Sequence, residues 1–338
     1  MKVTRRTFTA GSLAAPALLM SRETALAQVS EMPPVAQSEA VQIATDAYIY
    51  GYSLITTEVT RVQMSNVPAV AGLHAPMGQF INVKRYPPGD FRGVSAPNAD
   101  TLYSLAWIDL GKEPTVFSHP DMGDRYYLFP MYSLWMPVIT VPGSRTTGGQ
   151  AATYLITGPG WQGEVPAGMK EIKSPTRYFL ILGRTYANGT EADYAAVNAL
   201  QAEYKLVPLS AWGRPFTYVA PPVDPNPGFS MTDKPQQVIN GLGLKGYFDM
   251  MARLMGGAAP PAPEDAPILA RMAKIGLVPG RPFDLSRFDA ATRPRSTRCP
   301  TPRRRRSSPS RARPASCATA GTSRLPPAPT ARTICSGR

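Results

Sequence analysis

The hydrophobic positions of this chain are spaced first as in a helix, then as in strands, and then as in helices again. Over residues 38–62, apolar side chains recur at steps of three and four, the period of an amphipathic helix. Ser38 before Glu39 is typical of a helix start, and Asn66 with Pro68 is typical of a helix end. The predicted apolar face consists of Val41, Ala44, Tyr48, Gly51, Ile55, Val59 and Val62.

The middle of the chain has the pattern of a β protein. Residues 67–99 lack a period and are rich in Pro and Gly, so we expect a long loop there. From Thr101 onward, short β-rich runs alternate with turn residues, which is typical of an antiparallel sandwich. Residues 158–163, GPGWQG, predict a hairpin turn closed by Trp161. The predicted strands are Leu102–Ile108, Thr115–Ser118, Tyr126–Tyr132, Val138–Val141, Thr153–Ile156 and Tyr178–Arg184.

Helical patterns return after the sandwich. Thr190 followed by Asp193 is a variant capping box, Pro235 suits the first helical position, and Gly276 suits a helix stop. These signals predict helices over residues 190–204, 235–255 and 264–275. We therefore predict an α+β protein, an antiparallel β-sandwich with an N-terminal helix and a helical segment after the sandwich.

The first 27 residues have the pattern of an export signal. Thr4–Phe8 contains a twin-arginine pair, Ala10–Met20 is mildly apolar, and Ala25–Ala27 is an A-x-A cleavage site. We expect a twin-arginine signal peptide and a periplasmic or secreted mature protein; an Arg pair that occurs by chance is the alternative. No other window reaches the length of about 18 apolar residues that a spanning helix needs, so we expect no transmembrane segment.

Charge and cysteine are concentrated at the other end of the chain. The formal net charge is +13, but residues 293–338 hold twelve Arg and no Lys, Asp or Glu. Residues 1–27 hold four basic side chains and one acidic side chain, which leaves residues 28–292 with a net charge of −2. We therefore expect no nucleic-acid binding by the folded body. All three cysteines also lie in residues 293–338, so the body has no disulfide and no cysteine metal site.

These patterns divide the chain into five segments. Residues 293–338 contain too few apolar side chains to offset the entropy of ordering, so we expect a disordered basic tail. The predicted segments are a signal peptide at 1–27, a linker at 28–37, a helix plus β-sandwich domain at 38–210, a Pro-rich segment with helices at 211–292, and the tail at 293–338.

The familiar catalytic motifs are missing from the sequence. His74 and His119 are the only histidines, and neither has a partner at metal-ligand spacing. His119 precedes Pro120, and we expect it to be an ordinary surface residue. The chain has no G-x-S-x-G, P-loop or G-x-G-x-x-G motif. We therefore predict no metal and no cofactor.

The densest polar stretch is PNADTLYS at residues 97–104, where the long loop meets the first strand. Asp100 is a candidate catalytic residue, as a general base or as an acceptor for a ligand hydroxyl. Asn98, Thr101 and Tyr103 are candidate ligand-binding residues beside it. The alternative is local, with Asn98 and Asp100 as turn residues that hold backbone N–H groups before the strand.

A second polar cluster is GSRTTGGQ at residues 143–150. Arg145 is the other candidate catalytic residue, because a guanidinium can clamp a carboxylate or phosphate with two hydrogen bonds. Pairing with a structural Asp is an equal alternative. Arg125, Tyr127 and Trp135 complete the candidate ligand-binding set, since they add a cation and aromatic groups nearby in sequence.

Several stretches resemble one bacterial family of exported proteins, catalogued as domain of unknown function 1254. Besides PNADTLYS, they are AYIYGYSLITTEVTR at 47–61, DRYYLFPMY at 124–132, GSRTTGG at 143–149, YLITGPGWQGEVPAG at 154–168, ILGRTYANGTEADYAAVNALQ at 181–201 and IGLVPGRPFD at 275–284. The resemblance implies a β-sandwich joined to a helical segment, and it implies no established reaction. Many relatives carry Asp and then Thr-Asn where this chain has Ser133, Met136 and Pro137, which argues against a carboxylate-rich site around Trp135.

The resemblance also bears on the tail. Relatives continue into a second, jelly-roll-like domain, catalogued as domain of unknown function 1214. Near residue 292 this chain abruptly loses acidic, aromatic and Lys side chains and gains Cys. We therefore expect a frameshift near that residue, and translation of the other reading frames of the source DNA tests it.

The sequence supports three functional hypotheses. The leading one is an exported soluble protein that binds or acts on a small polar molecule through Asp100 and Arg145, with the question of catalysis left open. The alternative is a non-catalytic envelope scaffold that binds another protein. A nucleic-acid arm formed by residues 293–338 is the third, which deletion of the tail would test.

Overall fold

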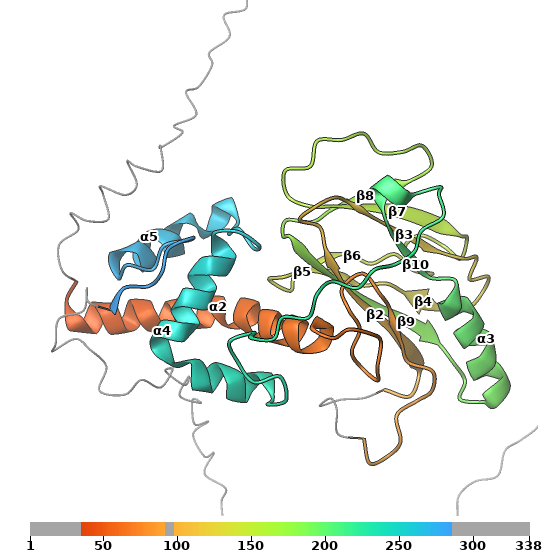
Figure 1. Ribbon diagram of the computed structural model, residues 1–338, viewed down its shortest axis with the longest axis horizontal. Coiled ribbons are helices and arrows are strands. Elements are labelled where there is room, and N and C mark those ends of the chain that lie inside the picture. Colours follow the sequence, from red (N-terminus) through yellow and green to blue (C-terminus); the bar gives the residue numbers. More distant parts are fainter. Residues whose placement is uncertain (1–34, 92–97, 286–338) are drawn as a thin grey trace, which may run out of the picture. The chain divides into compact units, whose positions relative to one another are not determined.

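The computed structural model of this protein describes residues 35–91 and 98–285. Within that part, the chain forms a long helix, two β-sheets, and further helices that follow most of the strands (Figure 1). This arrangement confirms the predicted α+β class with its N-terminal helix and its later helices. The predicted signal peptide and the predicted disordered tail lie outside the described residues.

The N-terminal helix α2 spans Gln37–Ser65, as its hydrophobic period predicts. The predicted apolar face is wrong at its first position, because Val41 is 54% exposed whereas Ala40 is buried. The later helices pack on the side of α2 that carries Ala40 and Ile43, and Val41 lies outside that contact. The helix also begins at Gln37 with Ala36 as its N-cap, instead of at the predicted Ser38.

The larger sheet has the strand order β1-β2-β9-β5-β6, and β4 also pairs with β9. All of its strand pairs are antiparallel. The longest pairing joins β2 to β9 along their whole length, from Thr101 opposite Tyr186 to Asp109 opposite Tyr178. The strands are β1 (Ile81–Asn82), β2 (Thr101–Asp109), β4 (Tyr127–Leu128), β5 (Met131–Ser133), β6 (Val138–Thr140) and β9 (Tyr178–Tyr186).

The smaller sheet has the order β10-β3-β7-β8. Its strands are β3 (Thr115–His119), β7 (Ala152–Thr157), β8 (Lys170–Lys173) and β10 (Lys205–Pro208). Strands β7 and β8 run parallel, so the hairpin predicted at residues 158–163 is wrong. Parallel neighbours need a crossover, because a tight turn can join only antiparallel strands. Residues 158–169 form that crossover.

The two sheets enclose an aromatic core. Phe117 of β3 lies with its ring centroid 4.9 Å from that of Phe129, which precedes β5. His119 belongs to this core, because it is only 3% exposed and its ring lies 5.5 Å from that of Phe129. The prediction of a surface histidine is therefore wrong. Side chains two apart on a strand share a face, and β3 continues through His119, so its ring follows Phe117 inward.

The opposite face of the larger sheet is covered by helices. Strand β9 alternates, with Phe179 and Ile181 in the sandwich core and Leu180 in a second core with α2 and the later helices. In that second core, the Tyr247 hydroxyl donates to the Tyr48 carbonyl at 2.8 Å. The alternation of β9 thus lets one strand contribute to both cores.

The later helices follow the predicted positions closely. Thr190 caps α3 by accepting a hydrogen bond from the Asp193 N–H, and Gly276, at φ 78°, lies just past α5. Helix α4 is interrupted at Gly243, whose φ of 65° and ψ of 178° are not helical. No helix in the described part of the chain is both long and apolar enough to cross a membrane. The helices are α3 (Glu191–Ala202), α4 (Pro235–Met255) and α5 (Ala266–Lys274), with short 3₁₀ turns η1 (Leu209–Ala211) and η2 (Pro263–Asp265).

Candidate functional site

Within PNADTLYS, the described residues from Asn98 onward form a local turn at the start of β2. Asn98 Oδ1 accepts hydrogen bonds from the backbone N–H groups of Asp100 and Thr101, at 3.1 and 2.9 Å. Asn98 Nδ2 donates to the Tyr103 hydroxyl at 2.7 Å. These contacts match the local alternative, in which Asn98 ties down backbone donors before the strand. Asp100 remains exposed, and its carbonyl accepts from the Ala187 N–H at 3.1 Å.

Arg125 is paired with a structural carboxylate. Its guanidinium donates to both oxygens of Asp193, at 2.7 and 3.2 Å, and to the Tyr186 carbonyl at 2.9 Å. The Asp193 carboxylate also accepts from the Asn188 N–H, and these bonds, that of Arg125 first, hold its pKa below its usual range. Arg125 therefore joins the start of α3 to the end of β9, and its ligand-binding role stays a prediction.

Arg145 lies on a loop that is held at several points. The Ser144 N–H donates to the Tyr127 carbonyl at 3.0 Å, and the Thr147 N–H donates to the Gly143 carbonyl at 2.8 Å. The exposed Arg145 guanidinium lies 5.2 Å from the centroid of the Tyr126 ring. Within residues 35–91 and 98–285, Arg145 forms no ion pair with a carboxylate. The structural partner that the sequence left open is therefore absent from the described chain.

An open cleft of about 510 Å³ lies at the end of the larger sheet where β9 finishes and α3 begins. We call it the edge cleft, and it is lined by Asp124, Arg125, Tyr126, Tyr186 and Asp193. The Tyr186 N–H donates to the Tyr126 carbonyl at 2.9 Å, and the next residue along the chain binds the Asp100 carbonyl. Two of the predicted residues, Asp100 and Arg145, thus lie next to residues that line the edge cleft.

Tyr127 and Trp135 lie elsewhere. The Tyr127 side chain is buried in the sandwich core, where burial raises its pKa and its hydroxyl donates to the Gly148 carbonyl at 2.7 Å. Trp135 packs against α2, with its ring 5.0 Å from that of Tyr50. Neither residue lines the edge cleft. Tyr127 instead holds the loop of Arg145 by hydrogen bonds to Ser144 and Gly148.

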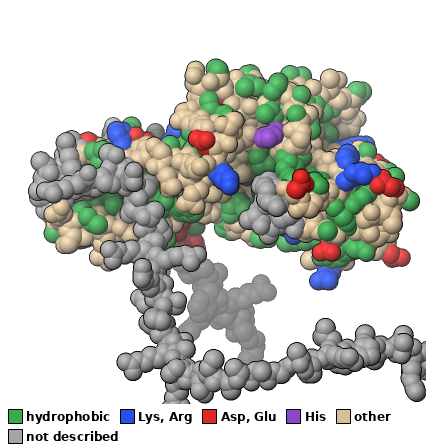
Figure 2. Space-filling view, turned by 90° about the horizontal axis from the view of Figure 1, so that it is seen from below, with side chains coloured by type: hydrophobic (Ala, Val, Ile, Leu, Met, Phe, Trp, Pro, Cys, Tyr) green, Lys and Arg blue, Asp and Glu red, His purple; other side chains and the backbone are tan. Residues whose placement is uncertain are grey.

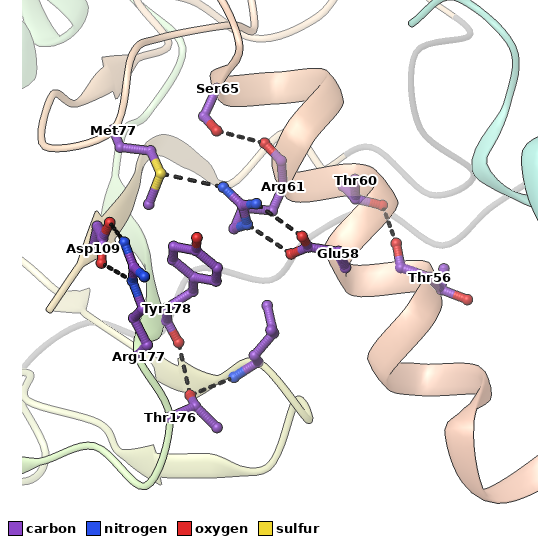
Figure 3. Close-up of polar contacts among 11 residues, drawn as sticks. Thr56, Glu58, Thr60, Arg61, Ser65, Met77, Asp109, Thr176, Arg177 and Tyr178 are labelled. Carbon is purple, nitrogen blue, oxygen red and sulfur yellow. Dashed lines mark hydrogen bonds and ion pairs between the residues drawn. The ribbon is translucent and has the colours of Figure 1, made fainter. Parts of the chain in front are cut away.

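A buried charged cluster was missed by the sequence reasoning (Figure 3). Glu58 and Arg61 of α2 are 3% and 8% exposed, and Arg61 donates to both Glu58 oxygens at 2.8 and 2.9 Å. Burial acts to lower the pKa of Arg61, but the hydrogen bond and charge of Glu58 raise it overall. The spacing of the two charges, three residues apart on the predicted helix, was visible in the sequence, but their burial was not, because neither residue lies on the predicted apolar face.

The cluster continues across the junction between α2 and the larger sheet. The Tyr178 ring lies between Arg61 and Arg177, with guanidinium carbons 3.9 and 5.2 Å from its centroid (Figure 3). Arg177 donates to both oxygens of Asp109, at 2.6 and 2.7 Å. Burial acts to raise the pKa of Asp109, but Arg177 holds it below its usual value. Because each charge has its partner, we interpret the cluster as structural.

Charges of both signs are mixed on one face of the protein. On the face shown in Figure 2, basic and acidic side chains lie among hydrophobic ones, and no continuous patch of one sign covers the described part of it. Within the described residues, no group of three or more His, Cys, Asp or Glu side chains is arranged to hold a metal ion.

Comparison with known proteins places the sheets in a described family. Residues 77–208 match the family described as "Protein of unknown function (DUF1254)". The crystal structure of the VPA0106 protein from Vibrio parahaemolyticus is similar in fold, with a TM-score of 0.55 and 22% sequence identity. The match covers 73% of this chain and 55% of that protein, so this chain spans about half of its length. No curated protein matches the sequence. Residues 77–208, which hold both β-sheets and all eight predicted site residues, are therefore supported as a domain of this family, whose description states no function.

Proposed function

We propose that this protein binds a small polar molecule in the edge cleft, and that Arg145 pairs with a carboxylate or phosphate group of that molecule. The observation that carries the proposal is a cation on a well-held loop without a carboxylate partner in the described chain. Tyr126 and the 44% exposed Tyr186 supply aromatic faces beside it. Asp100, next to the cleft, is the group that accepts a ligand hydroxyl or takes a proton from it.

The charges around the cleft set where the ligand's anionic group lies. Asp193 is neutralised by Arg125, whereas Asp124 repels an anion. The anionic group therefore lies on the Arg145 side of the cleft. A hydrogen-bonded charge pair contributes about 1.5–3 kcal/mol, and an exposed pair contributes about 0.2–1 kcal/mol. We expect Arg145 to contribute about 1–1.4 kcal/mol, between these two ranges, which improves affinity by about fivefold to tenfold.

Titration of the labelled protein with a panel of small carboxylates and phosphates, followed by nuclear magnetic resonance, tests this proposal. The expected result is a shift of the Tyr126, Arg145 and Tyr186 amides, with affinity reduced about fivefold to tenfold in Arg145→Ala. Lys170→Ala is the matched control, since Lys170 is an exposed cation on the distant strand β8. Equal affinity of Arg145→Ala and the native protein, or shifts confined to other parts of the protein, would show that the edge cleft is not the site.

Export by the twin-arginine route is part of the same proposal. Its support is the order of the charged, apolar and cleavage elements in residues 1–27. Replacement of Arg5 and Arg6 by Lys should leave the unprocessed protein in the cytoplasm, whereas the native protein should reach the periplasm or medium with Gln28 as its first residue. Unchanged fractionation of the variant would rule the route out.

The second candidate function is a non-catalytic envelope scaffold. It is favoured by a run of exposed apolar side chains after the sandwich, of which Val219 is 81% exposed. The others in this run are Trp212, Phe216 and Val223. Recovery of one defined envelope protein with the native chain, and its loss with Val219→Asp, would favour this function. Equal recovery with both chains would count against it.

A further inference from the structure

A second hollow lies at the C-terminal end of α3, whereas the edge cleft lies at its start, and the two share no lining residue. We call it the amide groove. Its volume is about 510 Å³, and it lies between the β1 strand, the C-terminal end of α3 and the segment around Phe216. Aromatic side chains line it, together with three amide side chains, Gln79, Asn82 and Gln201. Such a mixture of aromatic walls and few polar groups is typical of small-molecule sites.

The Gln201 amide is fixed in one orientation. Its Nε2 atom lies 3.2 Å from three acceptors, the carbonyls of Val83 and Tyr103 and the Ser104 hydroxyl. The nitrogen therefore faces the sheet, and Oε1 faces away from those acceptors. Gln201 is 1% exposed, and its Oε1 accepts no hydrogen bond within the described residues. A buried acceptor of this kind is costly unless a donor satisfies it.

Asn82 repeats the arrangement on the neighbouring element. Its Nδ2 atom donates to the Gln201 carbonyl at 3.2 Å, and its Oδ1 also accepts no hydrogen bond within the described residues. The backbone of Asn82 is held by pairing with Ser104 of β2. The groove therefore carries two well-positioned acceptors, and their natural partners are hydroxyl or amine donors.

The remaining lining suits a ligand with an apolar face and an anionic end. Phe216 is 39% exposed, and Tyr218 is held in place by its hydroxyl, which donates to the Met77 carbonyl at 2.8 Å. Burial raises the pKa of Tyr218 to about 12, so its ring stays uncharged at neutral pH. Lys205 and Arg214 line the groove as well, and neither pairs with a carboxylate in the described chain.

We propose that the amide groove binds a small hydroxylated carboxylate of the sugar-acid class. Its hydroxyl groups donate to the amide oxygens of Asn82 and Gln201, its C–H face packs on Phe216, and its carboxylate pairs with Arg214. Both oxygens lie below the surface of the groove, so binding includes a movement of the side chains that cover them. This site is independent of the edge cleft, since the two hollows use different cations.

Calorimetric titration of the full chain with gluconate, glucose and acetate tests the proposal. Gluconate carries both chemical features, whereas glucose lacks the carboxylate and acetate lacks the hydroxyl groups. We expect gluconate to bind about tenfold more tightly than either of the others. Equal affinity for the three probes, or no heat of binding with gluconate up to millimolar concentration, would overturn the proposal.

Two variants separate this site from the edge cleft. Arg214→Ala should weaken gluconate binding about fivefold to tenfold, and the same loss should appear in the Arg145→Ala background, in which carboxylate binding by the edge cleft is reduced. Arg214 is exposed, so its removal should not prevent folding. Asn82→Ala should also weaken gluconate binding, and thermal unfolding should check that this variant is still folded. A crystal structure with gluconate that shows only water on the two amide oxygens, or an affinity that falls in Arg145→Ala and not in Arg214→Ala, would refute the assignment.

Discussion

The buried pair of Glu58 and Arg61 allows a quantitative test of what holds α2 against the larger sheet. In Glu58→Gln the carboxylate is lost, and the Arg61 guanidinium remains 8% exposed beside Met77 and the Tyr178 ring. Removal of one partner from a buried ion pair typically costs about 3–5 kcal/mol, because a buried charge is left uncompensated. The contact with the Tyr178 ring offsets about 1 kcal/mol of this. We therefore expect Glu58→Gln to lower the free energy of unfolding by about 2–4 kcal/mol.

A double variant separates the penalty of the unpaired charge from the contribution of the pair itself. Glu58→Leu with Arg61→Met replaces both charges by apolar groups of similar volume, and such replacements are often neutral or stabilising. We expect the double variant to be within about 1 kcal/mol of the native protein. Lys274→Ala is the control for an exposed pair, since Lys274 and Glu39 are 45% and 48% exposed and such pairs contribute about 0.2–1 kcal/mol.

Urea unfolding followed by circular dichroism and by tryptophan fluorescence provides the assay. The expected loss for Glu58→Gln corresponds to a fall in Tm of about 4–16 °C for a folded part of this size. If Glu58→Gln costs no more than Lys274→Ala, Arg61 is not desolvated in the native protein. If the double variant is as unstable as the single variant, packing and not charge explains the loss. Either result would refute the reasoning.

Three further predictions concern stability. Burial raises the pKa of Tyr204 to about 12, above the value of about 10 in an unfolded chain. The contribution of the neutral Tyr204 side chain to the unfolding free energy is therefore complete below pH 10 and is lost as the pH rises to 12. Tyr204→Phe should reduce this alkaline loss by up to about 2–3 kcal/mol, measured by urea titrations at pH 9–12. Gly149→Ala would place a Cβ 2.1 Å from the Gly123 carbonyl oxygen and should destabilise the protein by about 1–3 kcal/mol, whereas Gly89→Ala, with open space around it, should change little. Met136 has a φ of 74°, so Met136→Gly should raise Tm, and an unchanged or lower Tm in a thermal scan would contradict this.

The strands that the sequence failed to predict share a position in the sheets. β1, β8 and β10 are all edge strands, and they have between two and four residues. Such short segments carry little hydrophobic alternation, and their extended form depends on the neighbouring strand, which a local pattern does not contain. The predicted strand at 126–132 is divided into β4 and β5 around Pro130, which has no N–H for a central ladder position.

For the side chains of the candidate site too, the sequence predicts local contacts but not contacts between residues far apart in the chain. Asn98 forms its contacts within five residues, so its turn could be read locally. The partner of Arg125 lies 68 residues away, and the amide pair of Asn82 and Gln201 spans 119 residues. These partners come from separate elements, because Asp193 and Gln201 lie on α3, whereas Arg125 and Asn82 lie in the sheet region. Only the fold therefore brings them together. The sequence can propose polar residues for a site, but it cannot tell which of them the protein itself already satisfies.

That difference decides where ligand chemistry is to be sought in this molecule. Glu58, Arg61, Asp109 and Arg177 are bound to one another in two bidentate pairs, so each charge is already compensated by its partner. The two hollows beside α3 have the opposite character. The Arg145 guanidinium beside the edge cleft has no carboxylate partner in the described chain, and the amide oxygens of Asn82 and Gln201 in the amide groove accept no hydrogen bond there. Because the cost of an unsatisfied buried group is removed only by a partner, these hollows, and not the more conspicuous charged cluster at the junction of α2 with the sheet, are the places where a ligand would gain most from binding.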